Sequence, residues 1–136
     1  MNMEKTILGN DLEICRILNG MWQVAGGHGQ IDSELAIQDM EKYQELGFTT
    51  WDLADIYGPA ESLIGGFSKK TKQNFQAFTK FVPNPGPMSN SIVTYYIDES
   101  LKKMNTECID LLQFHWWDYQ DSSYLDALQH LSKLQN

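Results

Sequence analysis

Four residues whose side chains could together protonate a carbonyl oxygen are spread along the chain. The stretch WDLADIYGPAE holds Asp52 and Tyr57, Lys80 lies in FTKF, and His115 lies in LLQFHWW. A tyrosine hydroxyl can donate a proton but is a weak acid at neutral pH, and a nearby ammonium favours its phenolate form. Lys80 could supply that positive charge, and Asp52 could hold Lys80 in place. His115 could orient the carbonyl substrate or share in the proton transfer.

These residues lie near the ends of segments that the sequence predicts to be strands. Apolar runs predict strands over 17–24, 48–53, 75–81 and 109–116, and the last run is apolar enough for burial on both faces. Helices are predicted from Asp32 or Ser33 to Gly47, from Pro59 to about Phe67, from Ser89 or Ser91 to about Met104, and over Tyr124–Leu134. We expect buried stripes of Leu35, Ala36, Met40, Tyr43 and Leu46, of Ile92, Tyr95, Tyr96 and Leu101, and of Leu125, Leu128 and Leu131.

Alternating strands and helices predict an α/β fold with a parallel sheet covered by helices. Two short strands around Gly9-Asn10-Asp11 predict a hairpin ahead of this alternation. We therefore expect an N-terminal β-hairpin over residues 1–16 and four βα units over residues 17–136. Ligands of parallel α/β sheets bind beyond the carboxyl ends of the strands, so the four candidate residues should meet there.

Each of the four residues has a plainer interpretation when it is taken alone. Asp52 could be a loop acid, Tyr57 a packing residue, Lys80 a surface lysine, and His115 a satisfied core histidine. Their joint placement at successive strand ends favours a functional site. Trp22 and Trp116 could wall its pocket with apolar surface, and for Trp116 simple packing is an equal alternative. No ligand spacing of a known type predicts a metal site.

The composition argues against several classes of partner. The net charge is −8 without a basic run, which disfavours nucleic acid and anionic membranes. No stretch approaches the roughly 18 apolar residues that a membrane span needs, and the N-terminus lacks the apolar region of a signal peptide. Cys15 and Cys108 have no CxxC spacing, so we expect both to be reduced packing residues in a cytoplasmic protein. Gly65-Gly66 indicates close helix packing or a helix end rather than phosphate binding.

Together the motifs resemble the N-terminal half of the aldo-keto reductase family. Asp52, Tyr57 and Gly58 match the family's Asp-x4-Tyr-Gly element, and Gly20 with Trp22 matches a Gly-x-Trp in its first strand. Lys80 and His115 match its strand-three lysine and strand-four histidine. The resemblance implies the first four βα units of a (β/α)8 TIM barrel. It also implies reduction of an aldehyde or ketone with NADPH, with NADH as the alternative cofactor.

The resemblance further implies a role for each matched residue. Tyr57 would be the general acid, Lys80 and Asp52 would tune it, and His115 would orient the carbonyl. Cofactor contacts are expected from Gly20, Met21 and Asp52, and substrate-pocket contacts from Trp22, Tyr57 and Trp116. The acids Asp55 and Glu61 would cap or brace the second helix.

The chain departs from the family in length. A complete barrel takes about 250 residues, and much of the family's cofactor site lies in strands five to eight. We therefore expect little or no turnover from these 136 residues alone. Four strands would also leave open edges, so we expect the chain to pair with another half or to aggregate. Three explanations stay open: a fragment of a longer product, a truncated gene product, or a half-barrel that forms a homo-oligomer through those edges. The alternative function is that of a non-catalytic, truncated half-barrel that acts as an assembly or binding module.

Overall fold

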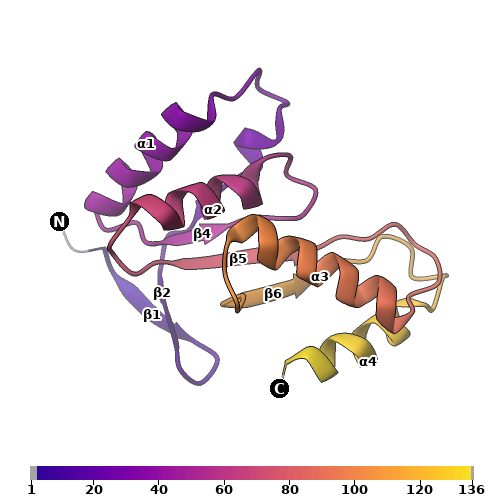
Figure 1. The fold of residues 1–136 in the computed structure, drawn as a ribbon. Coiled ribbons are helices and arrows are strands. Elements are labelled where there is room, and N and C mark those ends of the chain that lie inside the picture. Colours follow the sequence, from indigo (N-terminus) through magenta and orange to yellow (C-terminus); the bar gives the residue numbers. More distant parts are fainter. Residues whose placement is uncertain (1–2, 136) are drawn as a thin grey trace.

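The computed structural model describes residues 3–135 and contains two sheets (Figure 1). Strands β1 (Lys5–Leu8) and β2 (Leu12–Cys15) pair antiparallel, so the predicted hairpin is confirmed. Gly9 lies in its turn with a φ of 67°, a backbone conformation that costs glycine little. The predicted outer boundaries at residues 1 and 136 lie outside the described residues.

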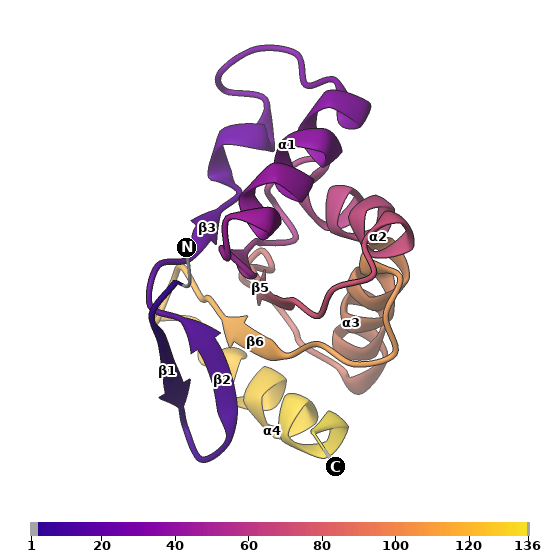
Figure 2. The same ribbon diagram turned by 90° about the vertical axis from the view of Figure 1, so that its left-hand side faces the viewer.

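The second sheet is parallel and has the strand order β3-β4-β5-β6. Its strands are β3 (Asn19–Gly20), β4 (Thr50–Asp52), β5 (Gln76–Phe81) and β6 (Leu111–Phe114). The helices α1 (Ser33–Glu45), α2 (Ala60–Lys70), α3 (Asn90–Met104) and α4 (Tyr124–Leu134) each follow one of these strands in the chain. Figure 2 shows the helices in an arc around the outer side of the strands. This arrangement is the predicted series of four βα units.

Cys15 joins the hairpin to the segment that leads into β4. Its backbone N–H donates a hydrogen bond to Thr50 Oγ1 at 2.9 Å, and its sulfur accepts one from the Thr49 N–H at 3.3 Å. Both cysteines are free thiols, but only Cys15 is buried. The packing role predicted for Cys108 is therefore wrong, because that side chain is exposed in the turn before β6.

All four strands of the parallel sheet are shorter than the apolar runs predict, and the two at its edges lose at least half of the predicted length. After Gly20 the chain turns into a short 3-10 helix, η1 (Trp22–Ala25), which Gly26 ends with a φ of 96°. At the other edge β6 covers only four residues, and all of them are half-buried. The expectation of burial on both faces fails for β6, because none of its four residues is fully buried.

The helices bury the predicted stripes only in part: Met40 is buried as predicted and Ala36, Leu101 and Leu131 are half-buried, but most of the predicted leucines and aromatic residues are exposed. In α1 the buried residues are Ile37, Met40 and Gln44, in α3 they are Val93, Ser100 and Met104, and in α4 only Ala127 is buried. Leu35, Tyr43, Tyr95, Leu125 and Leu128 are all exposed. Small side chains such as Ser100 and Ala127 let α3 and α4 approach their neighbours closely. The large side chains remain at the outside of these contacts.

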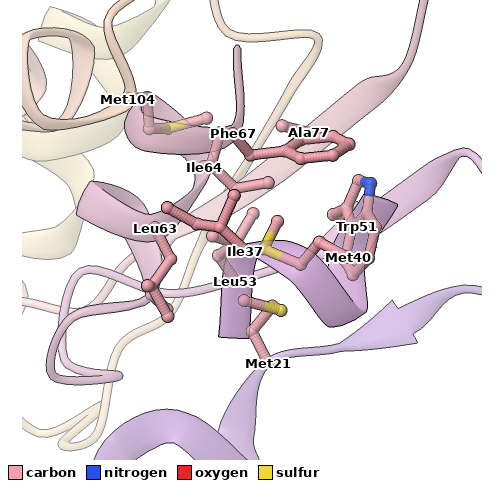
Figure 3. Packing of buried hydrophobic residues seen from close by; sticks show 11 residues of the cluster. Met21, Ile37, Met40, Trp51, Leu53, Leu63, Ile64, Phe67, Ala77 and Met104 are labelled. Atoms are coloured by element: carbon pink, nitrogen blue, oxygen red, sulfur yellow. The ribbon is translucent and has the colours of Figure 1, made fainter. Parts of the chain in front are cut away.

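The largest buried cluster fills the space between α1, α2 and the strands (Figure 3). Figure 3 shows Trp51 and Leu53 from the β4 region packed against Met40, Ile64 and Phe67 from α1 and α2. A second cluster joins α3 and α4 to the end of β5 and contains Phe81, Met88, Val93, Trp116 and Ala127. None of the helices within residues 3–135 has the length and apolar character needed to cross a membrane.

Candidate active site

Asp52 and Lys80 form a close ion pair at the carboxyl ends of two neighbouring strands. Asp52 is the last residue of β4, and Lys80 is the last but one of β5. Lys80 Nζ lies 2.7 Å from Asp52 Oδ1 and 2.8 Å from Asp52 Oδ2, and it donates a further hydrogen bond to the Leu53 carbonyl at 2.8 Å. All three N–H bonds of the ammonium therefore have acceptors. The pairing that the sequence predicts is present, and strand register accounts for it.

Tyr57 completes a compact group with this pair. The loop after β4 turns at Ala54, whose carbonyl accepts a hydrogen bond from the Tyr57 N–H at 3.0 Å. The turn places Lys80 Nζ over the Tyr57 ring, 5.2 Å from the ring centroid. Trp22 meets the same ring edge-on, with the centroids 5.2 Å apart. A cation over an aromatic face is attracted by the ring and would also stabilise a phenolate.

His115 reaches the same end of the sheet, and its ring contacts Trp117. Its backbone N–H donates to the Phe81 carbonyl at 2.9 Å, which extends the β5–β6 pairing by one residue. The exposed imidazole stacks on Trp117, with the ring centroids 4.4 Å apart. Within residues 3–135, the hydrogen bonds of the site join Asp52 and Lys80 directly and leave His115 outside.

Gln113 is a site residue that the sequence analysis missed. Its side-chain Nε2 donates to Asp52 Oδ1 at 3.3 Å, so Asp52 receives hydrogen bonds from both β5 and β6. Gln113 lies opposite Lys80 in the register of these strands. A signal was available, because side chains two residues apart on a strand point to the same side, and Gln113 precedes His115 by two.

Of the residues expected to contact the cofactor or the substrate, Gly20 and Trp22 are exposed and the side chain of Met21 is buried. Gly20 pairs with Asp52, and an added Cβ there would meet no atom within 4 Å, so this strand end is open. The Met21 N–H donates to the Asp52 carbonyl at 2.9 Å, but its side chain lies in the core cluster. Trp22 is exposed beside Tyr57 and lies where a pocket wall is expected.

Trp116 packs in the core in this structure and does not line a pocket. Only 4% of its surface is exposed, and its ring packs among the side chains of α3 and α4. Its indole N–H donates to the carbonyls of Asp118 and Asp121. Of the two interpretations of Trp116, the structure therefore agrees with packing. Its neighbour Trp117 is exposed and contacts His115.

Asp55 and Glu61, which were expected to cap or brace the second helix, both contact β5. The Asp55 carboxylate accepts hydrogen bonds from the Val82 N–H, and Glu61 Oε1 accepts one from the Thr79 hydroxyl at 2.8 Å. Burial raises the pKa of the Asp55 carboxyl, the hydrogen bond from Val82 opposes this rise, and the charge of Glu61 adds to it. Glu61 is buried, and its second oxygen lies 3.7 Å from Lys103 Nζ, an ion pair beyond hydrogen-bond length.

One groove of the molecule includes the expected cofactor contacts Gly20 and Met21 but none of the four catalytic candidates. This groove of about 680 Å³ runs between β3 and α1 and is lined by residues that include Gly20, Met21, Leu35, Tyr43 and Trp51. It contains none of Tyr57, Lys80 and His115, so we place the candidate site at the strand ends. Among residues 3–135, no group of three His, Cys, Asp or Glu side chains is arranged to hold a metal ion.

The fold and the site define part of a parallel α/β barrel with an ion pair and a tyrosine at its strand ends. The sequence model of the Aldo/keto reductase family matches residues 16–136, so the chain belongs to this family. The chain is 32% identical over 131 residues to 6-dehydroglucose reductase of Agrobacterium fabrum, an alignment that covers 83% of this chain and 43% of that protein.

Solved structures agree with the fold. An aldo/keto reductase from Brucella melitensis superposes with a TM-score of 0.76 at 20% identity and covers 98% of this chain and 50% of its own. The Bombyx mori aldo-keto reductase in complex with NADP gives a TM-score of 0.75 at 20% identity, over 98% of this chain and 47% of its own. The chain thus spans about half the length of the relatives that it matches.

Proposed function

We propose that this chain supplies the catalytic residues for reduction of an aldehyde or ketone to an alcohol, with NADPH as the hydride donor. The observation that carries the proposal is the Asp52–Lys80 ion pair, with the Lys80 ammonium over the Tyr57 ring, at the carboxyl ends of β4 and β5. Catalytic groups of α/β barrels lie at this end of the strands. Family membership supports the same chemistry.

Tyr57 acts as the general acid in this proposal. Its hydroxyl donates a proton to the carbonyl oxygen and becomes a phenolate. The Lys80 ammonium stabilises that negative charge through its field, because all three of its N–H bonds are directed at Asp52 and Leu53. Asp52, supported by Gln113, keeps the ammonium at its place above the ring. His115 orients the substrate carbonyl from the loop after β6.

The described residues fit one part of a nicotinamide cofactor. The open space at Gly20, whose strand partner is the half-buried Asp52, supports binding of a planar ring at this strand end. NADPH, when bound, supplies the hydride for the carbonyl carbon. The side chain of Met21 faces the core, so Met21 could contribute only its backbone. The Lys80 ammonium is hydrogen-bonded to Asp52 and to the Leu53 carbonyl, so it would not bind a phosphate group.

The test uses a chimaeric barrel and the isolated chain. In the chimaera, residues 16–136 replace the matching half of 6-dehydroglucose reductase, and carbonyl-dependent NADPH oxidation is followed by absorbance. We expect turnover that Tyr57→Phe reduces by roughly 10²-fold or more, because a general acid contributes about that factor. The isolated chain should show little turnover. A chimaera as active with Tyr57→Phe as without it would contradict the role of Tyr57, and steady turnover by the isolated chain would contradict its inactivity.

A further inference from the structure

Asp55 connects the loop that carries Tyr57 to the strand that carries Lys80. Its backbone N–H donates to the Lys80 carbonyl at 3.0 Å, and its carboxylate oxygens lie 3.1 and 3.2 Å from the Val82 nitrogen. Asp55 thereby binds β5 on both sides of Phe81. The backbone contact continues the strand pairing that Leu53 makes with Phe78, but the carboxylate contact depends on the side chain.

Glu61 provides a second connection on the far side of Tyr57. Its buried carboxylate accepts a hydrogen bond from the Thr79 hydroxyl, which ties the first turn of α2 to β5. The segment that contains Tyr57 is therefore attached to β5 at Asp55 and again at Glu61. Glu61 lies within a helix, whereas Asp55 lies in a loop without regular structure, so the loop's position depends more on the Asp55 side chain.

A capping role does not account for Asp55. The residue that precedes α2 is Pro59, and no side chain caps this helix end. The acceptor atoms of Asp55 are instead directed at the Val82 N–H, two residues beyond Lys80. A hydrogen bond to a charged acceptor is among the stronger ones in proteins, which suits a contact that must hold a loop.

We propose that Asp55 is a positioning residue whose hydrogen bonds to the end of β5 hold the Tyr57 ring beneath the Lys80 ammonium. Asp55 itself contacts neither group's reacting atoms. The inference rests on the proposed function in so far as the Tyr57–Lys80 geometry serves catalysis. The geometry itself can be measured without turnover.

The test compares variants of the 136-residue chain by nuclear magnetic resonance with labelled lysine. Protons next to Lys80 Nζ should show an upfield ring-current shift because the group lies over the Tyr57 ring. Lys80→Arg assigns the signal, and Tyr57→Leu defines its position without the ring. Asp55→Leu has a similar shape but no acceptor, and we expect it to lose most of the upfield shift. Asp55→Asn keeps an acceptor oxygen and should keep the shift.

The exposed Asp98 of α3 provides the matched control, and Asp98→Leu should leave the Lys80 signal unchanged. Circular dichroism verifies the fold of each variant, and Asp55→Ala replaces Asp55→Leu if the latter does not fold. An unchanged Lys80 shift in Asp55→Leu would overturn the proposal, as would loss of the shift in Asp98→Leu.

In the active chimaera we expect Asp55→Leu to lower turnover by roughly 10-fold to 100-fold, with rescue by Asp55→Asn. A chimaera that shows no turnover at all would count against the proposed function, while the lysine signal still decides the role of Asp55.

Discussion

At the scale of single residues, the Lys80–Asp52 pair differs from the other ion pairs of the chain. Its side chains are 17% and 28% exposed, whereas those of the Lys42–Asp39 pair are 70% and 64% exposed. Shielding from water strengthens the attraction, and Lys80 makes three hydrogen bonds where Lys42 makes one. The pair therefore contributes to the stability of the strand ends as well as to the candidate chemistry.

We expect Lys80→Met to lower the free energy of unfolding by about 1–3 kcal/mol, because it leaves Asp52 half-buried without its main partner. Lys42→Met, the control, should change it much less, because both side chains of that pair are exposed to water. Urea denaturation of both variants measures the difference. Equal effects of the two substitutions would show that the Asp52–Lys80 pair adds nothing beyond an exposed pair.

Asp55 should make the stability of the protein depend on pH. Because burial raises the pKa of its carboxyl in the folded chain, the folded state holds this proton more tightly than the unfolded state. The favourable contribution is complete below the ordinary aspartate pKa and is lost as the pH rises through the raised value. The charged groups facing Asp55 are Glu61, which raises the pKa further, and Lys103, which lowers it.

Asp55→Asn should remove this pH dependence while it retains an acceptor for the Val82 N–H. We expect the variant to be at least as stable as the original chain at neutral pH and relatively less stable in acid. Denaturation from acid to neutral pH measures the difference in free energy of unfolding between the two proteins. Burial also raises the pKa of Asp110, but both proteins contain Asp110, so its effect cancels in this difference. A difference that does not vary with pH would contradict the expectation.

At the scale of elements, Gly65 lets α2 approach α3. A Cβ at this position would lie 2.1 Å from the Lys103 carbonyl oxygen, which is backbone and cannot move away by itself. At Gly66 an added Cβ would meet the flexible end of Ile37 at 2.7 Å. The close contact at Gly65 brings Lys103 of α3 near Glu61 of α2, and Glu61 in turn binds β5.

Gly65→Ala should therefore destabilise the protein by about 1–3 kcal/mol, although alanine is the better helix former. Gly66→Ala is the matched control and should cost less, because Ile37 can change its side-chain rotamer. Thermal unfolding of the two variants provides the measurement. The prediction fails if Gly65→Ala is as stable as Gly66→Ala.

At the scale of the whole molecule, both edges of the parallel sheet are open. β3 and β6 each have one neighbouring strand, and the helices next to them expose Leu35 and Tyr43 on α1 and Leu125 and Leu128 on α4. Open edges and exposed apolar side chains favour association with further strands and helices.

We expect the purified 136-residue chain to sediment as a species heavier than its own 15.6 kDa. Leu125→Lys with Leu128→Lys should weaken this association, because charges would then occupy the apolar face of α4. Exposed polar positions of the same helix, such as Asp126→Lys and Gln129→Lys, serve as the control. Sedimentation as a stable monomer at micromolar concentration would contradict the expectation.

The sequence by itself determined the order of the elements and the identity of the main site residues. Apolar runs, caps and turn residues are local signals, and they placed the hairpin, the four helices and the strand ends with Asp52, Lys80 and His115. The five-residue spacing from Asp52 also predicted that Tyr57 lies in the loop after β4. Local signals do not state which neighbours an element has, so they could not show that β6 is an edge strand or which face of α1, α3 and α4 is buried.

Only the tertiary structure decided the contacts between segments far apart in the chain. Trp116 packs between α3 and α4, Gln113 reaches Asp52 across the sheet, and Asp55 binds Val82 of the next strand. Val82 is the residue after the end of β5, and each of these contacts depends on strand register and helix approach, which are set by packing over the whole chain. The residue types of a catalytic site are thus readable from the sequence, whereas the residues that hold them in position become evident only in three dimensions.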